Sequence, residues 1–106
     1  MNKILFVCTG NYYRSRFAEI YFNVQSEKRN LDWNAFSKGF DISNNSNIGL
    51  ISNHVICELQ ELKISLPNDL TFPKILTEND LMQAKKIIAM NLSEHKPFVL
   101  KQFPTW

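Results

Sequence analysis

Apolar residues along the chain occur first as a short continuous run and then at helical spacing. Residues 4–7 are Ile-Leu-Phe-Val and end at a polar turn, which predicts a strand buried on both faces. Apolar side chains then recur every three or four residues from Ser15 to about Lys28, without Gly or Pro, and predict a helix. A second short strand is expected over residues 33–37, followed by a polar loop.

The second half of the chain shows the same kinds of pattern. A stripe of apolar residues predicts a helix from about Asn47 to Lys63. Thr77 with an acid three residues on is typical of a helix N-cap, so a short helix is expected to run from there to Ala84. Residues 86–90 predict a third buried strand, and Ser93 is expected to cap a last helix.

These elements follow the order β-α-β-α-α-β-α, in which strands alternate with helices. This order predicts an α/β fold with a parallel sheet, helices on both faces and right-handed crossovers. A length of 106 residues predicts a single domain over residues 1–106. Hydrophobic residues make up 44% and charged residues 21% of the chain, which excludes collagen, coiled-coil and low-complexity classes.

Net charge and the numbers of cysteines and histidines limit which partners and sites the chain can have. A net charge of +2 is too small to indicate nucleic acid as a partner, although it leaves room for a local anion site. Cys8, Cys57 and two histidines are too few for a disulfide framework or a four-ligand zinc site, so we expect no metal and no cofactor. His54 and Cys57 lie three residues apart on a predicted helix, where a structural role is expected.

The compartment is predicted from what the sequence lacks. The apolar run at the start is too short for a signal peptide, and no stretch approaches the roughly 20 apolar residues of a membrane span. The sequence therefore predicts a cytoplasmic protein with free thiols.

A cysteine and an arginine flank the loop between the first strand and the first helix, where the sequence is Cys8-Thr9-Gly10-Asn11-Tyr12-Tyr13-Arg14-Ser15. Ligands of open α/β sheets bind at this edge, and a loop that closes into a helix N-terminus directs several backbone N–H groups at one point. We expect residues 9–15 to bind a tetrahedral anion, with Arg14 donating two parallel N–H bonds to it. The same field favours the thiolate of Cys8, which places a nucleophile beneath the anion.

The other loop residues have expected supporting roles. Ser15 can donate its hydroxyl to the thiolate or to the departing phosphate, and Asn11 can lock the loop through side-chain bonds to backbone. Gly10 permits a positive φ where the loop turns. Tyr12 and Tyr13 are expected either at the rim of the pocket, where one can stack on an aryl substrate, or packed in the core.

The chemistry that this loop implies is phosphoryl transfer. Cys8 attacks phosphorus, Arg14 and the loop amides stabilise charge on the equatorial oxygens, and water later hydrolyses the phosphocysteine. A leaving alkoxide departs slowly unless an Asp or Glu protonates it, so a weak or missing acid would favour aryl phosphates.

Several segments together match the pattern of one enzyme family. They are Ile4–Asn11 with Arg14-Ser15 and Ala18-Glu19, then Phe36–Gly39, then residues 76–84, and finally 87–90 with His95. Through these segments, nearly the whole chain resembles the low molecular weight protein tyrosine phosphatases. The resemblance implies hydrolysis of phosphotyrosine in proteins or of a small aryl phosphate, with inorganic phosphate as product or inhibitor. It also implies that Ser37 supports Asn11.

The chain departs from this family at several positions. Tyr13 stands where a second cysteine is usual, Arg16 replaces a common proline, and Asn91 replaces an aspartate. The family's general acid, in an Asp-Pro motif, is absent from these 106 residues, so no general acid is assigned. Asp41 and Glu94 fall in predicted loops near strand ends, from which either could approach the site as a substitute acid. The family's last strand and helix are absent too. This predicts a sheet of three strands in the order 2-1-3, with an uncovered edge through which copies of the chain could associate.

Two other functions stay open. The missing acid and edge fit a catalytically dead module that binds a phosphorylated partner, or a truncated fragment. An arsenate reductase on the same fold would need further cysteines to relay a disulfide, and Cys57 alone cannot supply two.

Overall fold

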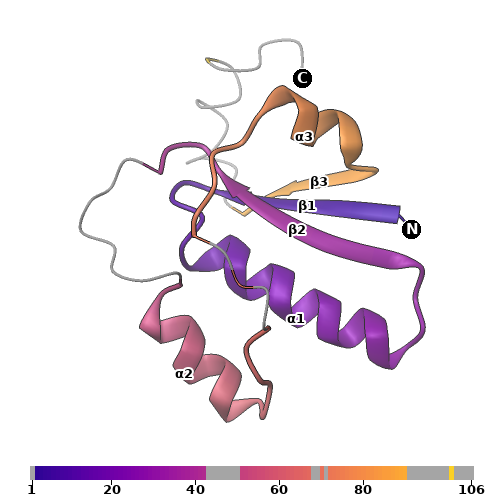
Figure 1. The fold of residues 1–106 in the computed structure, drawn as a ribbon, viewed down its shortest axis with the longest axis vertical. Coiled ribbons are helices and arrows are strands. Elements are labelled where there is room, and N and C mark those ends of the chain that lie inside the picture. The colour runs from indigo at the N-terminus through magenta and orange to yellow at the C-terminus, as the bar shows by residue number, and fades with distance from the viewer. Residues whose placement is uncertain (1, 43–50, 68–69, 71, 91–100, 102–106) are drawn as a thin grey trace.

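The fold is a parallel sheet with helices on both sides, seen in a computed structural model that describes residues 2–42, 51–67, 70, 72–90 and 101. The strands are β1 (Asn2–Cys8), β2 (Trp33–Gly39) and β3 (Lys86–Ala89), in the order β2-β1-β3. The helices within these residues are α1 (Arg14–Lys28), α2 (Asn53–Glu61) and α3 (Glu78–Gln83) (Figure 1). The expected α/β fold and its strand order 2-1-3 are confirmed.

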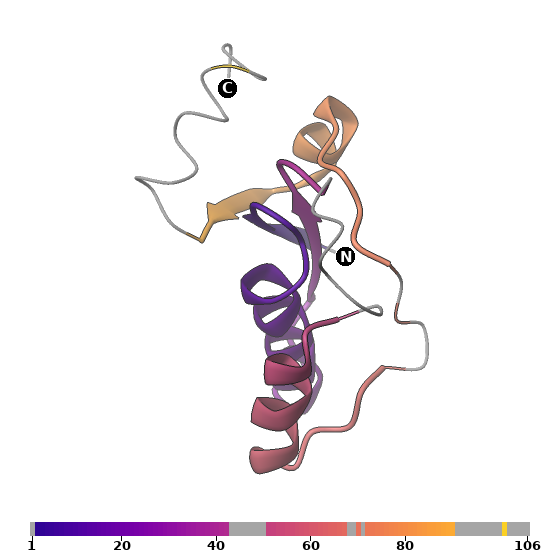
Figure 2. The same cartoon turned by 90° about the vertical axis from the view of Figure 1, so that its left-hand side faces the viewer.

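Alternate side chains of β1 enter two different cores, because successive residues of a strand point to opposite faces. Ile4 and Phe6 pack with Ala35 and the α1 residues Ala18 and Phe22 on one face. The views in Figures 1 and 2 place α1 and α3 on opposite sides of the sheet. A central strand buried on both faces explains the continuous apolar run at residues 4–7.

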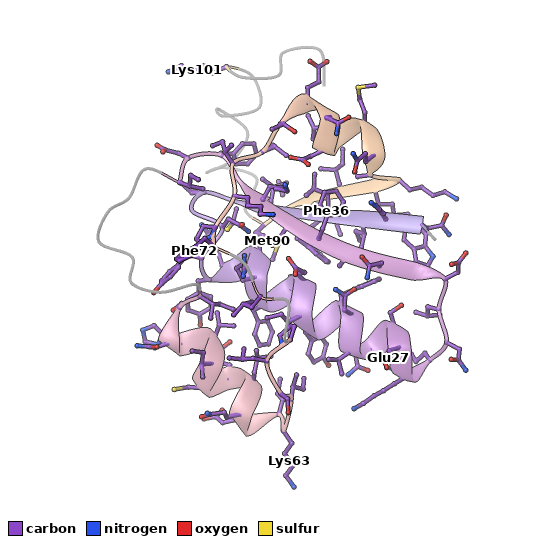
Figure 3. All side chains as sticks on the ribbon, in the orientation of Figure 1. Glu27, Phe36, Lys63, Phe72, Met90 and Lys101 are labelled. Carbon is purple, nitrogen blue, oxygen red and sulfur yellow. The ribbon has the colours of Figure 1, made fainter. Side chains whose placement is uncertain are left out.

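The second face of the sheet packs against α3 and the segment that precedes it. Leu5 and Val7 of β1 join Phe40, Leu76 and Leu81 there, all of them buried. Phe36 of β2, labelled in Figure 3, packs against the same cluster.

Helix α2 packs on α1 rather than on the sheet, through a cluster of Ile20, Ile51, Val55 and Leu59. The helix begins later than Asn47, the expected start. Ser52 has extended backbone, and its hydroxyl accepts a hydrogen bond from the His54 N–H at 3.2 Å. This N-cap sets the start of the helix at Asn53, and residues 43–50 lie outside the described ranges.

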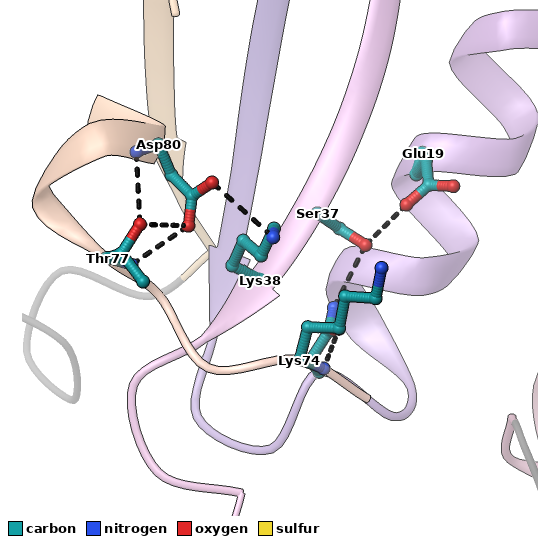
Figure 4. Close-up of polar contacts among 7 residues, drawn as sticks. Glu19, Ser37, Lys38, Lys74, Thr77 and Asp80 are labelled. Atoms are coloured by element: carbon teal, nitrogen blue, oxygen red, sulfur yellow. Dashed lines mark hydrogen bonds and ion pairs between the residues drawn. The ribbon is translucent and has the colours of Figure 1, made fainter. Parts of the chain in front are cut away.

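Helix α3 begins with the predicted cap. The Thr77 hydroxyl accepts from the Asp80 N–H at 3.2 Å, and the Asp80 carboxylate accepts from the Thr77 N–H at 2.9 Å, which completes a capping box. The other Asp80 oxygen lies 3.4 Å from the Lys38 ammonium (Figure 4). The cap thus also ties α3 to the end of β2.

The third strand pairs as expected with β1, but the prediction that it is buried is wrong. All four residues of β3 are exposed, with Ile87 at 42% and Ile88 at 41%. The cause is its position at the edge of the sheet, where no further strand pairs with it among the described residues. The last helix predicted from Ser93 lies outside the described residues, and the single domain over 1–106 stays a prediction. Within the described ranges, no helix is long and apolar enough to cross a membrane.

Gly39 at the end of β2 lies directly against the loop that follows β1. A Cβ atom at this position would be 2.7 Å from the Thr9 carbonyl oxygen and 2.9 Å from the Asn11 amide nitrogen. Both are backbone atoms, so a larger residue forces the loop or the strand to move.

We predict that Gly39→Ala lowers the free energy of unfolding by about 1–3 kcal/mol, because the methyl group overpacks this contact. Urea unfolding measures the change. Asn34→Ala, at an exposed position of the same strand, is the matched control and should stay within about 0.5 kcal/mol. Equal stability of the Gly39→Ala protein and the parent would contradict the close approach.

Candidate active site

The candidate site lies at the carboxyl end of the central strand. Cys8 is the last residue of β1 and is 2% exposed, and Arg14 is the first residue of α1. Residues 9–13 turn between them, and no side chain caps α1 at Tyr13. The structure therefore brings a buried sulfur and the N-terminus of a helix to the two ends of one short loop.

Asn11 holds this loop in shape. It has a φ of 50° and is fully buried. Its amide donates to the Ser15 hydroxyl and to the Ser37 hydroxyl, each at 2.9 Å, and its carbonyl oxygen accepts from the Lys74 N–H at 2.9 Å. Asparagine tolerates a left-handed backbone better than most residues, so Asn11 can both turn the chain and bind three other segments.

The sulfur of Cys8 lies 2.9 Å from the Ser15 hydroxyl oxygen, close enough for a hydrogen bond. Because Asn11 already donates to that oxygen, the Ser15 proton can point at the sulfur. An ionised Cys8 has no proton of its own, and Ser15 then acts as the donor.

Glu19 of α1 extends this network through Ser37 of β2, and the sequence pattern had assigned it no role. The Ser37 hydroxyl donates to the Glu19 carboxylate at 2.5 Å (Figure 4). The same hydroxyl accepts a hydrogen bond from the Asn11 amide. Glu19 lies one helical turn after Ser15, a spacing that places the two on the same side of α1 and could have indicated the link. Five side chains thus form one hydrogen-bonded chain: Glu19, Ser37, Asn11, Ser15 and Cys8.

Backbone hydrogen bonds join the loop of residues 9–13 to two other segments of the chain. The Asp41 N–H donates to the Thr9 carbonyl at 2.9 Å, and the Ser52 N–H donates to the Tyr12 carbonyl at 3.0 Å. The segments that follow β2 and precede α2 therefore hold the loop. Asp41 lies beside it, whereas Glu94 is outside the described residues.

The side chain of Tyr13 lies at the surface and contacts α2. It is 37% exposed, its hydroxyl donates to Glu58 at 2.5 Å, and its ring stacks on His54 with centroids 5.9 Å apart. The hydrogen bond to Glu58 raises the pKa of Tyr13. Sequence reasoning left the pocket rim and the core open for this residue, and the structure places it at the surface rather than in the core. Cys57, farther along α2, is exposed and free.

Arg16 differs from the other arginines because it is buried, with 3% of its surface exposed. Burial lowers the pKa of Arg16, and the charges of Glu19 and Cys8 oppose that change. Arg16 and Glu19 also line a cavity of about 780 Å³ between α1 and β2, together with Ser37, Lys38 and Lys74. In the described part of the chain, no three His, Cys, Asp or Glu residues gather as metal ligands.

The comparisons with known proteins agree with this geometry. The family model of the low molecular weight phosphotyrosine protein phosphatases matches residues 3–104. The chain belongs to that family. The resemblance seen in the sequence is therefore confirmed.

Relatives within this phosphatase family are close enough to compare in detail. The chain is 36% identical over 100 residues to the protein-arginine-phosphatase of Bacillus subtilis (strain 168), covering 94% of this chain and 62% of that protein. A low molecular weight protein tyrosine phosphatase from T. tengcongensis superposes with a TM-score of 0.81 at 32% identity, over 98% of this chain and 67% of its own.

A third relative has a covalently modified active site. It is a YwlE arginine phosphatase in which serine replaces the active-site cysteine and is phosphorylated. Its TM-score is 0.80 at 31% identity, and the match covers 98% of this chain and 64% of that one. The chain thus spans about two thirds of the length of these phosphatases.

We predict that Asn11→Ala lowers the free energy of unfolding by about 3 kcal/mol, because it leaves buried partners unsatisfied and places a Cβ-bearing residue in a left-handed conformation. Urea titration checks this value. Asn11→Gly removes the same hydrogen bonds but relieves the backbone, so it should be more stable than Asn11→Ala by about 1 kcal/mol. If Asn11→Ala lowers the free energy of unfolding by less than about 1 kcal/mol, the hydrogen-bond network contributes little to stability.

Proposed function

We propose that the protein is a phosphatase that works through a phosphocysteine on Cys8. The observation that carries this proposal is the position of the buried Cys8 sulfur, 2.9 Å from the Ser15 hydroxyl in the first turn of α1. The phosphorylated active-site serine of the YwlE variant supports it, because that serine stands in place of the cysteine.

The first step is attack of the Cys8 thiolate on phosphorus. A sulfur–phosphorus bond forms, the bond from phosphorus to the leaving group breaks, and the leaving group takes up a proton. The N–H groups of residues 9–15, the dipole of α1 and the Arg14 guanidinium stabilise the charge on the equatorial oxygens.

The second step releases phosphate. Water attacks phosphorus, the sulfur–phosphorus bond breaks, and the thiolate of Cys8 leaves with its electron pair. Ser15 donates a hydrogen bond to that thiolate as it forms, which makes Cys8 a better leaving group. Inorganic phosphate is the product and, by binding the same loop, an inhibitor.

The substrate we propose is a phosphorylated side chain of a protein. Phosphotyrosine and small aryl phosphates fit the family and the exposed ring of Tyr13, the residue before Arg14. Phosphoarginine is the second candidate, because the 36% identical relative is a protein-arginine-phosphatase. Two free cysteines fit the reducing cytoplasm that we propose as the location.

The 106 residues contain no Asp-Pro dipeptide, the motif in which this family carries its general acid. We therefore expect activated leaving groups such as p-nitrophenol to react much faster than alkyl phosphates, since they depend less on protonation. The same observation favours a second function, a module that binds a phosphorylated partner without turnover. Arsenate reduction has no such support, because Cys57 is the only other cysteine and is exposed on α2.

We predict that the purified chain hydrolyses p-nitrophenyl phosphate, that Cys8→Ser abolishes this activity, and that Cys57→Ser retains it. Arg14→Lys should weaken vanadate binding by at least about tenfold, because lysine cannot offer two parallel donors. Rates with phosphotyrosine and phosphoarginine peptides then decide between the two substrates. Vanadate binding without turnover of any substrate would select the binding module, and equal rates for Cys8→Ser and the parent would exclude the enzyme.

A further inference from the structure

Two lysines lie beside the ring of Trp33, the first residue of β2. The Lys85 and Lys86 ammonium groups are 5.9 and 6.0 Å from the ring centroid, within the range of a cation–π interaction. Lys86 begins β3, and β1 lies between β3 and β2, so the contact spans the central strand. These three residues form a lysine–tryptophan cluster.

The cluster holds two positive charges ready for a negatively charged partner. Both lysines are exposed, so their ammonium groups stay accessible, whereas Trp33 is partly buried against Ile4 and Phe6. Contact with this fixed ring restricts two long side chains, so less entropy is lost when a partner binds them. Two like charges beside one ring also repel each other, and a negative charge placed between them relieves that repulsion.

Further positive charge lies at the same end of the sheet. The Trp33 carbonyl accepts from the Ser26 hydroxyl at 2.7 Å, which joins the start of β2 to the last part of α1, and the Lys85 N–H donates to the Lys3 carbonyl at 2.8 Å. The exposed basic residues here are Lys3, Lys28, Arg29, Lys85 and Lys86, and the exposed acidic ones are Glu27 and Asp32. This end of the sheet therefore carries at least the whole net charge of the chain, which is +2.

The cluster lies at the end of the sheet opposite the candidate active site. The three strands are parallel, so their starts share one end, and Cys8 lies at the other end of β1 (Figure 1). Seven residues of β1 place the two ends about 20 Å apart at roughly 3.3 Å per residue. A partner bound to the cluster therefore leaves the loop of residues 9–15 accessible.

The chemistry of the cluster favours the carboxylates of an extended peptide. In an extended chain, side chains two residues apart lie on the same side and about 7 Å from each other, which suits two ammonium groups beside one ring. A nucleic acid or a membrane would instead use an aromatic ring that is free to stack on a base or to insert between lipids. The Trp33 ring is partly buried in the core and already contacts two lysines.

We propose that the lysine–tryptophan cluster is a docking site for an acidic, extended segment of a partner protein. Two carboxylates of that segment pair with the Lys85 and Lys86 ammonium groups, and the other basic residues at this end attract the segment at longer range. The inference goes beyond the proposed function, because docking needs no turnover and takes place away from Cys8.

The test is the binding of a fluorescein-labelled peptide of alternating glutamate and serine, measured by fluorescence anisotropy at about 0.1 M salt. Excess inorganic phosphate is present, so that residues 9–15 do not bind the peptide. The parent protein should bind it. Lys85→Met with Lys86→Met should weaken binding by about fivefold or more, because two ion pairs are lost.

Lys63→Met with Lys101→Met is the matched control, because it removes two exposed lysines that lie away from the start of β3 (Figure 3). This control should keep the affinity of the parent. Lys85→Glu with Lys86→Glu should lose the glutamate peptide and gain affinity for a peptide of alternating lysine and serine. Thermal unfolding verifies that each variant is folded.

Equal affinity of the parent and the Lys85→Met with Lys86→Met variant would overturn the inference, as would a parent that binds no peptide. Tighter binding of a thymidine oligonucleotide or of anionic lipid vesicles, lost in the same variant, would also overturn it, because the occupant would then belong to another class. Peptide binding by a protein that hydrolyses no phosphate ester would refute the proposed function and leave the docking site intact.

Discussion

The site depends on the hydrogen bonds of the Asn11 side chain. This side chain joins the loop after β1 to α1 through Ser15, to β2 through Ser37 and to the segment before α3 through the Lys74 N–H. A buried amide in a left-handed loop residue has few alternative partners, so its hydrogen bonds fix the loop in one shape. The orientation of Cys8 and the start of α1 follow from that shape. Gly39 makes it possible, because its lack of a side chain lets the loop approach β2.

Charge is balanced around this fixed loop rather than concentrated in one ion pair. In the proposed mechanism, the helix N-terminus and Arg14 supply positive charge, and the bound phosphate and the Cys8 thiolate supply negative charge. Burial lowers the pKa of Arg16, and the charges of Glu19 and Cys8 oppose that change. The hydrogen-bonded chain from Glu19 to Cys8 gives these groups fixed positions. Little reorganisation is then needed when phosphate arrives, which is the condition under which electrostatic stabilisation is most effective.

Local pattern predicted much of this fold because its causes are local. The apolar run of β1 and the capping box at Thr77 are read from neighbouring residues, and both are present in the structure. The burial of β3 could not be read this way, since it depends on what lies beside the strand. The contacts of Lys74 and Glu58 could not be predicted for the same reason. Lys74 bonds Asn11, which is 63 positions away, and Glu58 bonds Tyr13, which is 45 positions away. The sequence indicated Cys8, Arg14 and the loop, but not the hydrogen bond by which Ser37 joins the loop network to Glu19.

The most direct test of the central claim is to trap the covalent intermediate. The parent protein is mixed with p-nitrophenyl phosphate, quenched in acid within the first turnovers, digested and examined by mass spectrometry. We expect one added phosphate on the peptide that contains Cys8 and none on the peptide that contains Cys57. Turnover with no phosphate on Cys8, or with phosphate on another residue, would contradict the account.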